Sequence, residues 1–470
     1  MALGQFGCAG WPLVGPDYRQ PALNLPTVWS QPPARDSANL RPDFLSGWWR
    51  QLGDPLLDQL VDEALKNSPD LRSAQARLRQ ARASRNLAVG NLLPTVNASL
   101  TSSKTSATAN SPSDTRTLYR GGFDASWEID LFGGTRRSIE AATADQAASE
   151  ASLNNTQVSL VAEVVLNYVE LRNNQNRLAI ARDNLASQSE TLAITQWRHQ
   201  VGLVSGLDVD QALTTREQTR ASIPDLENGR VQAENRLAVL LGRNPGTLNE
   251  RLSTAQALPS VPDDIATGIP ADILTQRPDL IAAERKLAAE TARVGQKMAA
   301  RFPSLSLDGS FGWQAYSLGA LGGSGTVIRA LSGALAATLF DGGKLRSQVE
   351  IQSAVQEEAL VAYEKSVLTA LEEVENALAA YANGRERQAA RRLAVASARS
   401  AAVLARQMYQ SGLSDFQKVL DTERTRLTAE DGLANADAAT LTALVQLYKA
   451  LGGGWESRAA ATLSTEKPES

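Results

Sequence analysis

The sequence predicts an α+β chain in which two copies of one unit each combine two β-strands with a long helical hairpin. Three observations predict this: an internal repeat, segments whose polarity alternates residue by residue, and long stretches with heptad-spaced apolar residues. Alternation with period two is typical of strands, whereas sustained heptads indicate packed helices.

The composition excludes several classes of function. The 470 residues carry a net charge of -4, so the chain lacks the basic balance of a nucleic-acid-binding protein. The chain has one histidine, His199, and one cysteine, Cys8. These are too few ligands for a structural zinc site and too few cysteines for an intrachain disulfide. A glycine-rich stretch at 322–325 lacks the lysine of a phosphate loop, so we predict no enzyme and no cofactor. No run of about 18 apolar residues occurs, so the chain is either soluble or a membrane protein built from strands.

The repeat is visible where residues 68–96 align with residues 277–305. Pro69 aligns with Pro278 and Pro94 aligns with Pro303, and the two residues of each pair are 209 positions apart. Similar offsets continue to the end of each half, which favours duplication over two coincidentally similar alanine-rich helices. The predicted boundaries are an N-terminal segment 1–67, a first repeat 68–242, a linker 243–270, a second repeat 271–452 and a tail 453–470.

Four segments are predicted to be strands, at 96–101, 123–131, 304–313 and about 328–340, with loops at 102–120 and 317–326. They form either a soluble sheet with one solvent-exposed face or the lipid-facing wall of a barrel with a polar lumen. Four strands cannot close a barrel, and an open edge is excluded in lipid. If the strands meet lipid, two chains would supply eight strands and three chains twelve, and only the larger barrel leaves an open lumen. Trp127 and Trp313 suit either an interfacial girdle or a buried anchor.

The helices are predicted to be exceptionally long. Between Gly134 and Gln200 the chain has no proline or glycine over roughly 67 residues, about 100 Å of helix. Leu171, Leu178 and Leu185 follow one another at heptad spacing, and 207–241 and 416–450 are predicted to return antiparallel, with a kink at Pro224. A coiled-coil scaffold would explain these helices but not the strands.

Several motifs together resemble the TolC-type outer-membrane factors, specifically the OprM-, OprN- and NodT-like lipoprotein branch that serves RND efflux pumps. The motifs are Gly15-Pro16-Asp17-Tyr18, Trp48-Trp49, Asp54-Pro55, Trp127-Glu128-Ile129-Asp130-Leu131-Phe132-Gly133, Arg277-Pro278-Asp279, Phe302-Pro303, Val419-Leu420-Asp421, Glu423-Arg424 and Leu451-Gly452-Gly453-Gly454-Trp455. The resemblance covers residues 15–455. It implies a homotrimer that shares a 12-stranded transmembrane barrel, a coiled-coil helical barrel in the periplasm, and a collar built from the N-terminal segment, the linker and the C-terminal region.

The function that this resemblance implies is a passive exit duct for small molecules in the bacterial outer membrane. Its partners would be a periplasmic adaptor protein and an inner-membrane RND transporter. A type I secretion duct and a coiled-coil scaffold are the alternatives, and the sequence does not specify the cargo.

The resemblance also implies roles for particular residues. Gly7-Cys8-Ala9 is similar to the end of a lipobox, so Cys8 is a candidate for lipidation, with an unmodified thiol as the alternative. The predicted adaptor-docking tips are Gly202, Leu203 and Ser205 in the first hairpin and Gly412, Leu413 and Ser414 in the second; each is otherwise a simple turn residue. The predicted gate consists of Asp415, Gln417, Asp421 and Arg424.

Asp421 has a physical argument of its own beside the resemblance. Three copies around one axis would repel one another and attract cations, and Asp415 could add a second acidic ring. The alternative for each is a solvated carboxylate on a helix surface.

Overall fold

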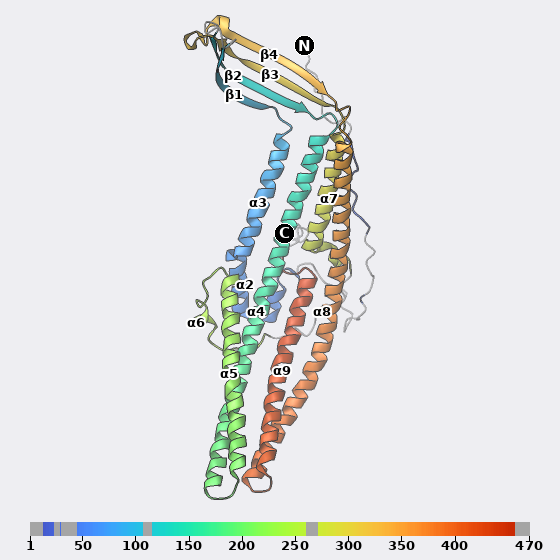
Figure 1. Ribbon diagram of the computed structural model, residues 1–470. Coiled ribbons are helices and arrows are strands. Elements are labelled where there is room, and N and C mark those ends of the chain that lie inside the picture. The colour runs from blue at the N-terminus through green and yellow to red at the C-terminus, as the bar shows by residue number, and fades with distance from the viewer. Residues whose placement is uncertain (1–12, 23–28, 30–44, 107–114, 260–270, 456–470) are drawn as a thin grey trace, which may run out of the picture. The chain divides into compact units, whose positions relative to one another are not determined.

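The computed structural model describes residues 13–22, 29, 45–106, 115–259 and 271–455 (Figure 1). Cys8 lies outside these residues. The chain divides into two compact units: residues 1–23, 76–151 and 281–366 form the first, and residues 24–75, 152–280 and 367–470 form the second. The two longest helices, α4 (Gly134–Gln200) and α8 (Lys344–Gln410), each contribute residues to both units.

The first unit contains one four-stranded antiparallel sheet in the order β1-β2-β3-β4 (Figure 1). Its strands are β1 (Thr95–Ser106), β2 (Thr115–Ile129), β3 (Ser304–Ala315) and β4 (Val327–Ala336). The short 3₁₀ turns η4 (Leu318–Ala320) and η5 (Ser324–Thr326) lie in the connection from β3 to β4. The four predicted strands and the loop at 317–326 are confirmed.

Three predicted strand limits are wrong: the end of the first strand, the start of the second and the end of the last. Residues 102–106 and 115–120, expected in a loop, extend β1 and β2, because ladder hydrogen bonds use the backbone and tolerate the serine-rich sequence. The last strand ends at Ala336 and does not reach residue 340. Ala336 pairs with Ser304, the first residue of β3, and the residue before Ser304 is Pro303, which has no N–H with which to continue the ladder.

The register gives the sheet one apolar and one polar face. Phe123 lies opposite Phe311 and Trp127 opposite Leu307 on the apolar face. On the other face Asp124 lies opposite Ser310. This alternation is the one that the sequence predicts, and it is regular from Phe123 to Ile129 of β2 and along β3.

Helices α3 (Pro69–Gly90) and α7 (Pro278–Ala299) are the equivalent helices of the two repeats. Each begins at its proline, where the missing N–H costs no helical hydrogen bond. In the first unit the Gly15-Pro16-Asp17-Tyr18 segment packs along α7. A Cβ on Gly15 would come within 2.4 Å of the Gly295 Cα, so this close approach requires glycine. The buried Arg137 guanidinium donates to Asp17 at 2.7 Å and holds the segment in place.

The second unit contains two helical hairpins. The first pairs α4 with α5 (Gly206–Leu240), and the second pairs α8 with α9 (Phe416–Ala450). The predicted helix limits agree with the structure within a residue or two. Pro224 lies inside α5 and does not end it.

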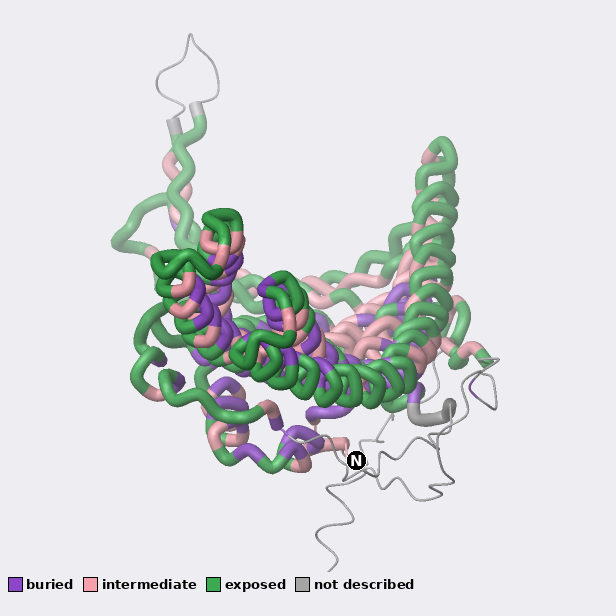
Figure 2. Tube along the Cα trace, turned by 90° about the horizontal axis from the view of Figure 1, so that it is seen from below, coloured by how far each residue is buried: buried purple, intermediate pink, exposed green. Residues whose placement is uncertain are grey.

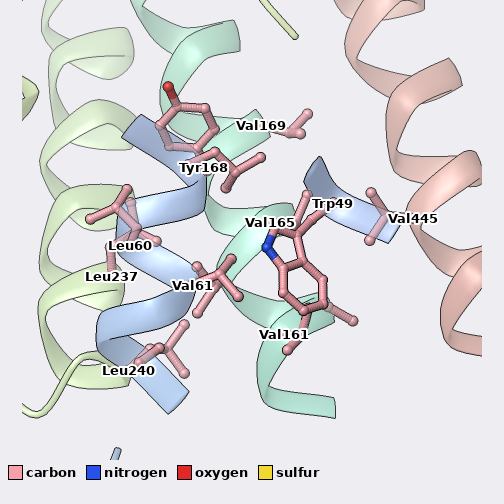
Figure 3. Close-up of a cluster of buried hydrophobic side chains, with 14 of the residues drawn as sticks. Trp49, Leu60, Val61, Val161, Val165, Tyr168, Val169, Leu237, Leu240 and Val445 are labelled. Carbon is pink, nitrogen blue, oxygen red and sulfur yellow. The ribbon is translucent and has the colours of Figure 1, made fainter. Parts of the chain in front are cut away.

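The core of the second unit gathers apolar side chains from η1 (Trp48–Leu52), α2 (Pro55–Asn67), α4, α5, α6 (Asn249–Leu252) and α9. Figure 3 shows Val61 of α2 beside Val161 and Val165 of α4, and Leu60 of α2 beside Leu237 of α5. The short 3₁₀ helix η3 (Ala271–Gln276) precedes α7. Each fully buried aliphatic side chain contributes about 1.5–3 kcal/mol, so this cluster holds the N-terminal helices onto the hairpins.

Arg172 fixes the segment that links the two repeats. Its side chain is fully buried, and its Nη1 donates to the carbonyl of Thr254 at 2.8 Å. Its Nη2 donates to the Tyr168 hydroxyl at 3.0 Å, and that hydroxyl donates to Asp54 at 2.5 Å. Burial and the bond to Asp54 raise the pKa of Tyr168. The helix α2, the helix α4 and the linker are thus joined through one chain of polar contacts.

Candidate functional site

The two hairpins end in turns of the same geometry, 210 residues apart. Gly202 and Gly412 both have φ of 77°, a conformation that glycine adopts at little cost. Leu203 N donates to the Arg198 carbonyl at 2.9 Å, and Leu413 N donates to the Met408 carbonyl at 2.8 Å. These bonds close each helix with a Schellman motif.

The helices that return from the turns are capped at equivalent positions. Ser205 begins α5 in a capping box with Asp208: its hydroxyl accepts from Asp208 N at 3.3 Å, and Asp208 accepts from Ser205 N at 2.9 Å. Asp415 begins α9, and its carboxylate accepts from Lys418 N at 3.0 Å. Such caps are each worth about 1 kcal/mol. Ser205 and Asp415 therefore have a structural role, independent of any function at the tips.

The tips expose apolar side chains. Leu203 is 69% exposed and Leu413 is 76% exposed, and Trp197, just above the first turn, is 63% exposed. Ser414 is half-buried. Seen from below in Figure 2, both turns are exposed, while buried positions begin in the helices behind them. The predicted docking residues thus lie at the ends of the hairpins, accessible to another protein.

The predicted gate residues follow one another along the first turns of α9. Gln417 Nε2 donates to the Asp421 carboxylate at 3.1 Å, and both side chains are exposed. Arg424 Nη2 donates to the Thr215 hydroxyl at 3.1 Å and so links α9 to α5 of the other hairpin. The structure thus groups Asp421 with Gln417, places Asp415 at the helix cap and ties Arg424 to the first hairpin.

One residue that binds the hairpins together was not predicted as a site residue. Glu423 is 2% exposed, and its Oε1 accepts from Arg406 Nη2 at 2.8 Å and from the Thr191 hydroxyl at 3.2 Å. The Arg406 guanidinium also donates to the hydroxyl of Ser187. This cluster joins α4, α8 and α9 by means of a buried carboxylate.

Further polar contacts connect α4 to the second hairpin above Glu423. Arg426 donates to the Asn184 amide oxygen at 2.6 Å, and Asn184 donates to Glu430 at 3.1 Å. The sequence carries a signal for this interface: the buried polar residues Asn184, Gln188, Thr191 and Thr195 follow heptad-like spacing beside the leucine heptads. The spacing identifies the buried face but not the partner of each side chain.

Two further observations concern the described residues as a whole. None of the helices they form is both long and apolar enough to cross a membrane. Within the same residues, no cluster of three or more histidine, cysteine or acidic side chains is arranged to hold a metal ion.

The family model of the outer membrane efflux proteins matches this chain twice, at residues 60–243 and 269–453. The chain belongs to that family. The two matches cover the two halves of the internal duplication.

Among relatives, outer membrane protein OprJ of Pseudomonas aeruginosa is 32% identical over 94% of this chain and 93% of its own length. A pyoverdine export outer membrane protein of Pseudomonas putida, OpmQ, is 34% identical over 92% of each chain. The solved structure of the outer-membrane channel OprN superposes with a TM-score of 0.87 at 36% identity, covering 94% of this chain and 99% of that one. The chain is therefore an outer-membrane efflux channel whose helical part lies in the periplasm, and the predicted α+β fold is confirmed.

Proposed function

We propose that this efflux channel is the exit duct of a tripartite RND-type pump, in which three copies share one 12-stranded barrel. The sheet carries this proposal: it has an apolar face, a polar face and four strands, so that β1 and β4 each keep one edge unpaired in the described chain. A lipid-facing sheet requires paired edges, and twelve strands leave an open lumen where eight would be filled by side chains.

The pump partners in this proposal are a periplasmic adaptor protein and an inner-membrane RND transporter. Relatives with names such as toluene efflux pump outer membrane protein TtgF, 30% identical over 96% of this chain, support a place in a pump of several proteins. The exposed tips around Leu203 and Leu413 provide an apolar surface for an adaptor.

The gate in this proposal lies at the hairpin tips, on α9. Three copies of the exposed Asp421 would surround the pore axis, and Gln417 would orient each carboxylate through its hydrogen bond. Arg424 would hold α9 against α5, because its bond to Thr215 must break if the two hairpins move apart. A ring of carboxylates concentrates cations and makes the pore cation-selective.

Asp421→Ala tests the gate in planar lipid bilayers. We expect the reversal potential in a salt gradient to shift away from the cation value, with an altered single-channel conductance, because three charges leave the constriction. Asp210→Ala is the matched control, since Asp210 is also an exposed carboxylate near a tip, but on α5. Unchanged selectivity and conductance in Asp421→Ala would show that Asp421 is only a solvated surface residue.

A further inference from the structure

Charges on the polar face of the sheet are segregated along its strands. In β2 a charged residue occurs at every fourth position: Arg116, Arg120, Asp124 and Glu128. Because side chains repeat on one face every two residues, all four lie on the same face. The two arginines lie toward the loops that connect β1 to β2 and β3 to β4, which we call the loop end of the sheet. The two carboxylates lie toward the end where β2 leads into α4, the helix end.

The other strands reinforce this separation. Asp308 of β3 lies opposite Ser126, between the levels of Asp124 and Glu128. On the same face the described residues of β1 and β4 are uncharged. The polar face of the sheet therefore carries, among the described residues, two positive charges toward its loop end and three negative charges toward its helix end.

The apolar face has a different pattern and supplies a control. Its described charges are Lys104 and Arg329, both basic. Arg329 lies opposite Phe311, only a few residues from the level of Arg120. It thus resembles Arg120 in charge and height but lies on the face away from the polar side chains.

Arg120 keeps its positive charge uncompensated among the described residues. Its Nη2 and Nε donate to the Gln314 amide oxygen at 2.8 and 3.3 Å. Gln314 is also its cross-strand neighbour in the register, so a neutral group holds the guanidinium in place. A guanidinium held by a neutral partner can pair with two oxygens of a phosphate or carboxylate.

The basic and acidic zones are too far apart to cancel each other. Four residues of strand span about 13 Å, which exceeds the screening length of about 8 Å at physiological salt. Each zone therefore acts on nearby solutes with its own sign, and a ring of like charges focuses its field into the space that it encloses.

We propose that Arg120, together with Arg116, forms a basic collar at the loop end of the channel that binds multivalent anions. The proposal rests on the shared barrel with the polar face inward, which would bring six guanidinium groups from three chains into the loop end of the lumen, as one ring of three at the level of Arg120 and one at the level of Arg116. The collar would retain phosphate-bearing or multiply carboxylated solutes at the exit, while the acidic zone below it would favour cations. The outer end of the duct would thus have a charge selectivity opposite to that of the proposed gate.

The test uses the full chain, purified and added to one chamber of a planar bilayer. The polar helical hairpins cannot cross lipid and stay in that chamber, so the loop end opens to the opposite one. Pyrophosphate in the opposite chamber should block the current at much lower concentration than pyrophosphate beside the hairpins. Arg120→Gln should raise the half-blocking concentration at least about tenfold, through loss of one charge-assisted hydrogen bond per chain.

Three further variants complete the experiment. The Arg329→Gln channel should have the same half-blocking concentration of pyrophosphate as the natural protein, because this substitution removes a guanidinium from the other face. The Arg120→Lys channel should still be blocked by pyrophosphate, whereas Gln314→Leu should weaken the block. These two variants keep the test decisive even if the Arg120→Gln protein does not assemble. Equal block from both chambers, or equal block in all variants, would overturn the collar and leave the channel proposal standing. Absence of current steps with the natural protein would overturn both.

Discussion

Glu423 is the residue at which three helices of the second unit meet. Its carboxylate is 2% exposed and accepts hydrogen bonds from α4 and α8. Burial of a carboxylate is unfavourable unless it is paired, so the bond to Arg406 is what allows Glu423 to lie at the interface. The neighbouring Asp421 is exposed and free to face solutes, although both acids lie within one turn of α9.

Glu423→Ala should destabilise the packing of the two hairpins by about 2 kcal/mol, because the half-buried Arg406 loses its nearer carboxylate and the hydroxyl groups of Thr191 and Ser187 lose an acceptor. Thermal unfolding and limited proteolysis of the hairpins would measure the change. Glu190→Ala is the control: Glu190 pairs with the same Arg406 at 3.7 Å but is 66% exposed, so its loss should cost under about 1 kcal/mol. Equal effects of the two variants would contradict the structural role of Glu423.

The residue-level site could be predicted only in part. Asp421, Gln417 and Arg424 were predicted from a family resemblance, and the structure adds their hydrogen-bond partners. Glu423 lies beside them in the same motif. Its partners are Thr191 of α4, which is 232 positions away in the sequence, and Arg406 of α8, which is 17 positions away. Heptad spacing indicates which face of a helix is buried, but the pairing of polar groups across helices depends on their relative register.

The elements followed the sequence most closely where proline or glycine fixes the backbone. Pro69 and Pro278 begin helices, and Gly202 and Gly412 end them, because these residues restrict or permit particular backbone angles. The strands were less predictable. Residues 102–106 have the serine-rich composition of a loop but pair along β2, since a backbone ladder forms with most side chains.

Substitutions of Asp415 separate a capping role from an acidic ring. Asp415→Asn keeps an oxygen that can accept from Lys418 N, so we expect near-natural thermal stability and channel selectivity. Asp415→Ala removes the cap and should destabilise the start of α9 by about 1 kcal/mol, seen as faster hydrogen exchange in its first turn. A loss of cation selectivity in Asp415→Asn would instead assign the residue to the gate as a charge.

At the scale of the whole chain, duplication produced two hairpins with unequal surroundings. The helices α4 and α8 both have fully buried positions, such as Val164 and Val374, but Trp197 is the one exposed large apolar residue among the described residues of α4, whereas α8 exposes several along its length. Those exposed on α8 are Ile351, Val355, Val361, Leu368, Leu393, Val403, Leu404 and Met408. Apolar surface of this extent is typical of a contact with another protein, and a second copy of the chain is the partner that a shared barrel supplies.

The sheet also indicates that the chain requires further copies of itself. The register of β1 to β4 leaves the outer edges of β1 and β4 without partners in the described chain. Both features, the open sheet edges and the apolar surface of α8, follow from a protomer that is incomplete alone. The sequence predicts that incompleteness from the number of strands, whereas the number of copies depends on the family resemblance.

The mass of the detergent-solubilised complex, measured by native mass spectrometry, tests this account most directly. We predict a single species containing three 50.2 kDa chains, held together at low detergent concentration. A stable species of one chain would contradict the shared barrel, because four strands cannot enclose a lumen, and a species of two chains would contradict the open 12-stranded duct.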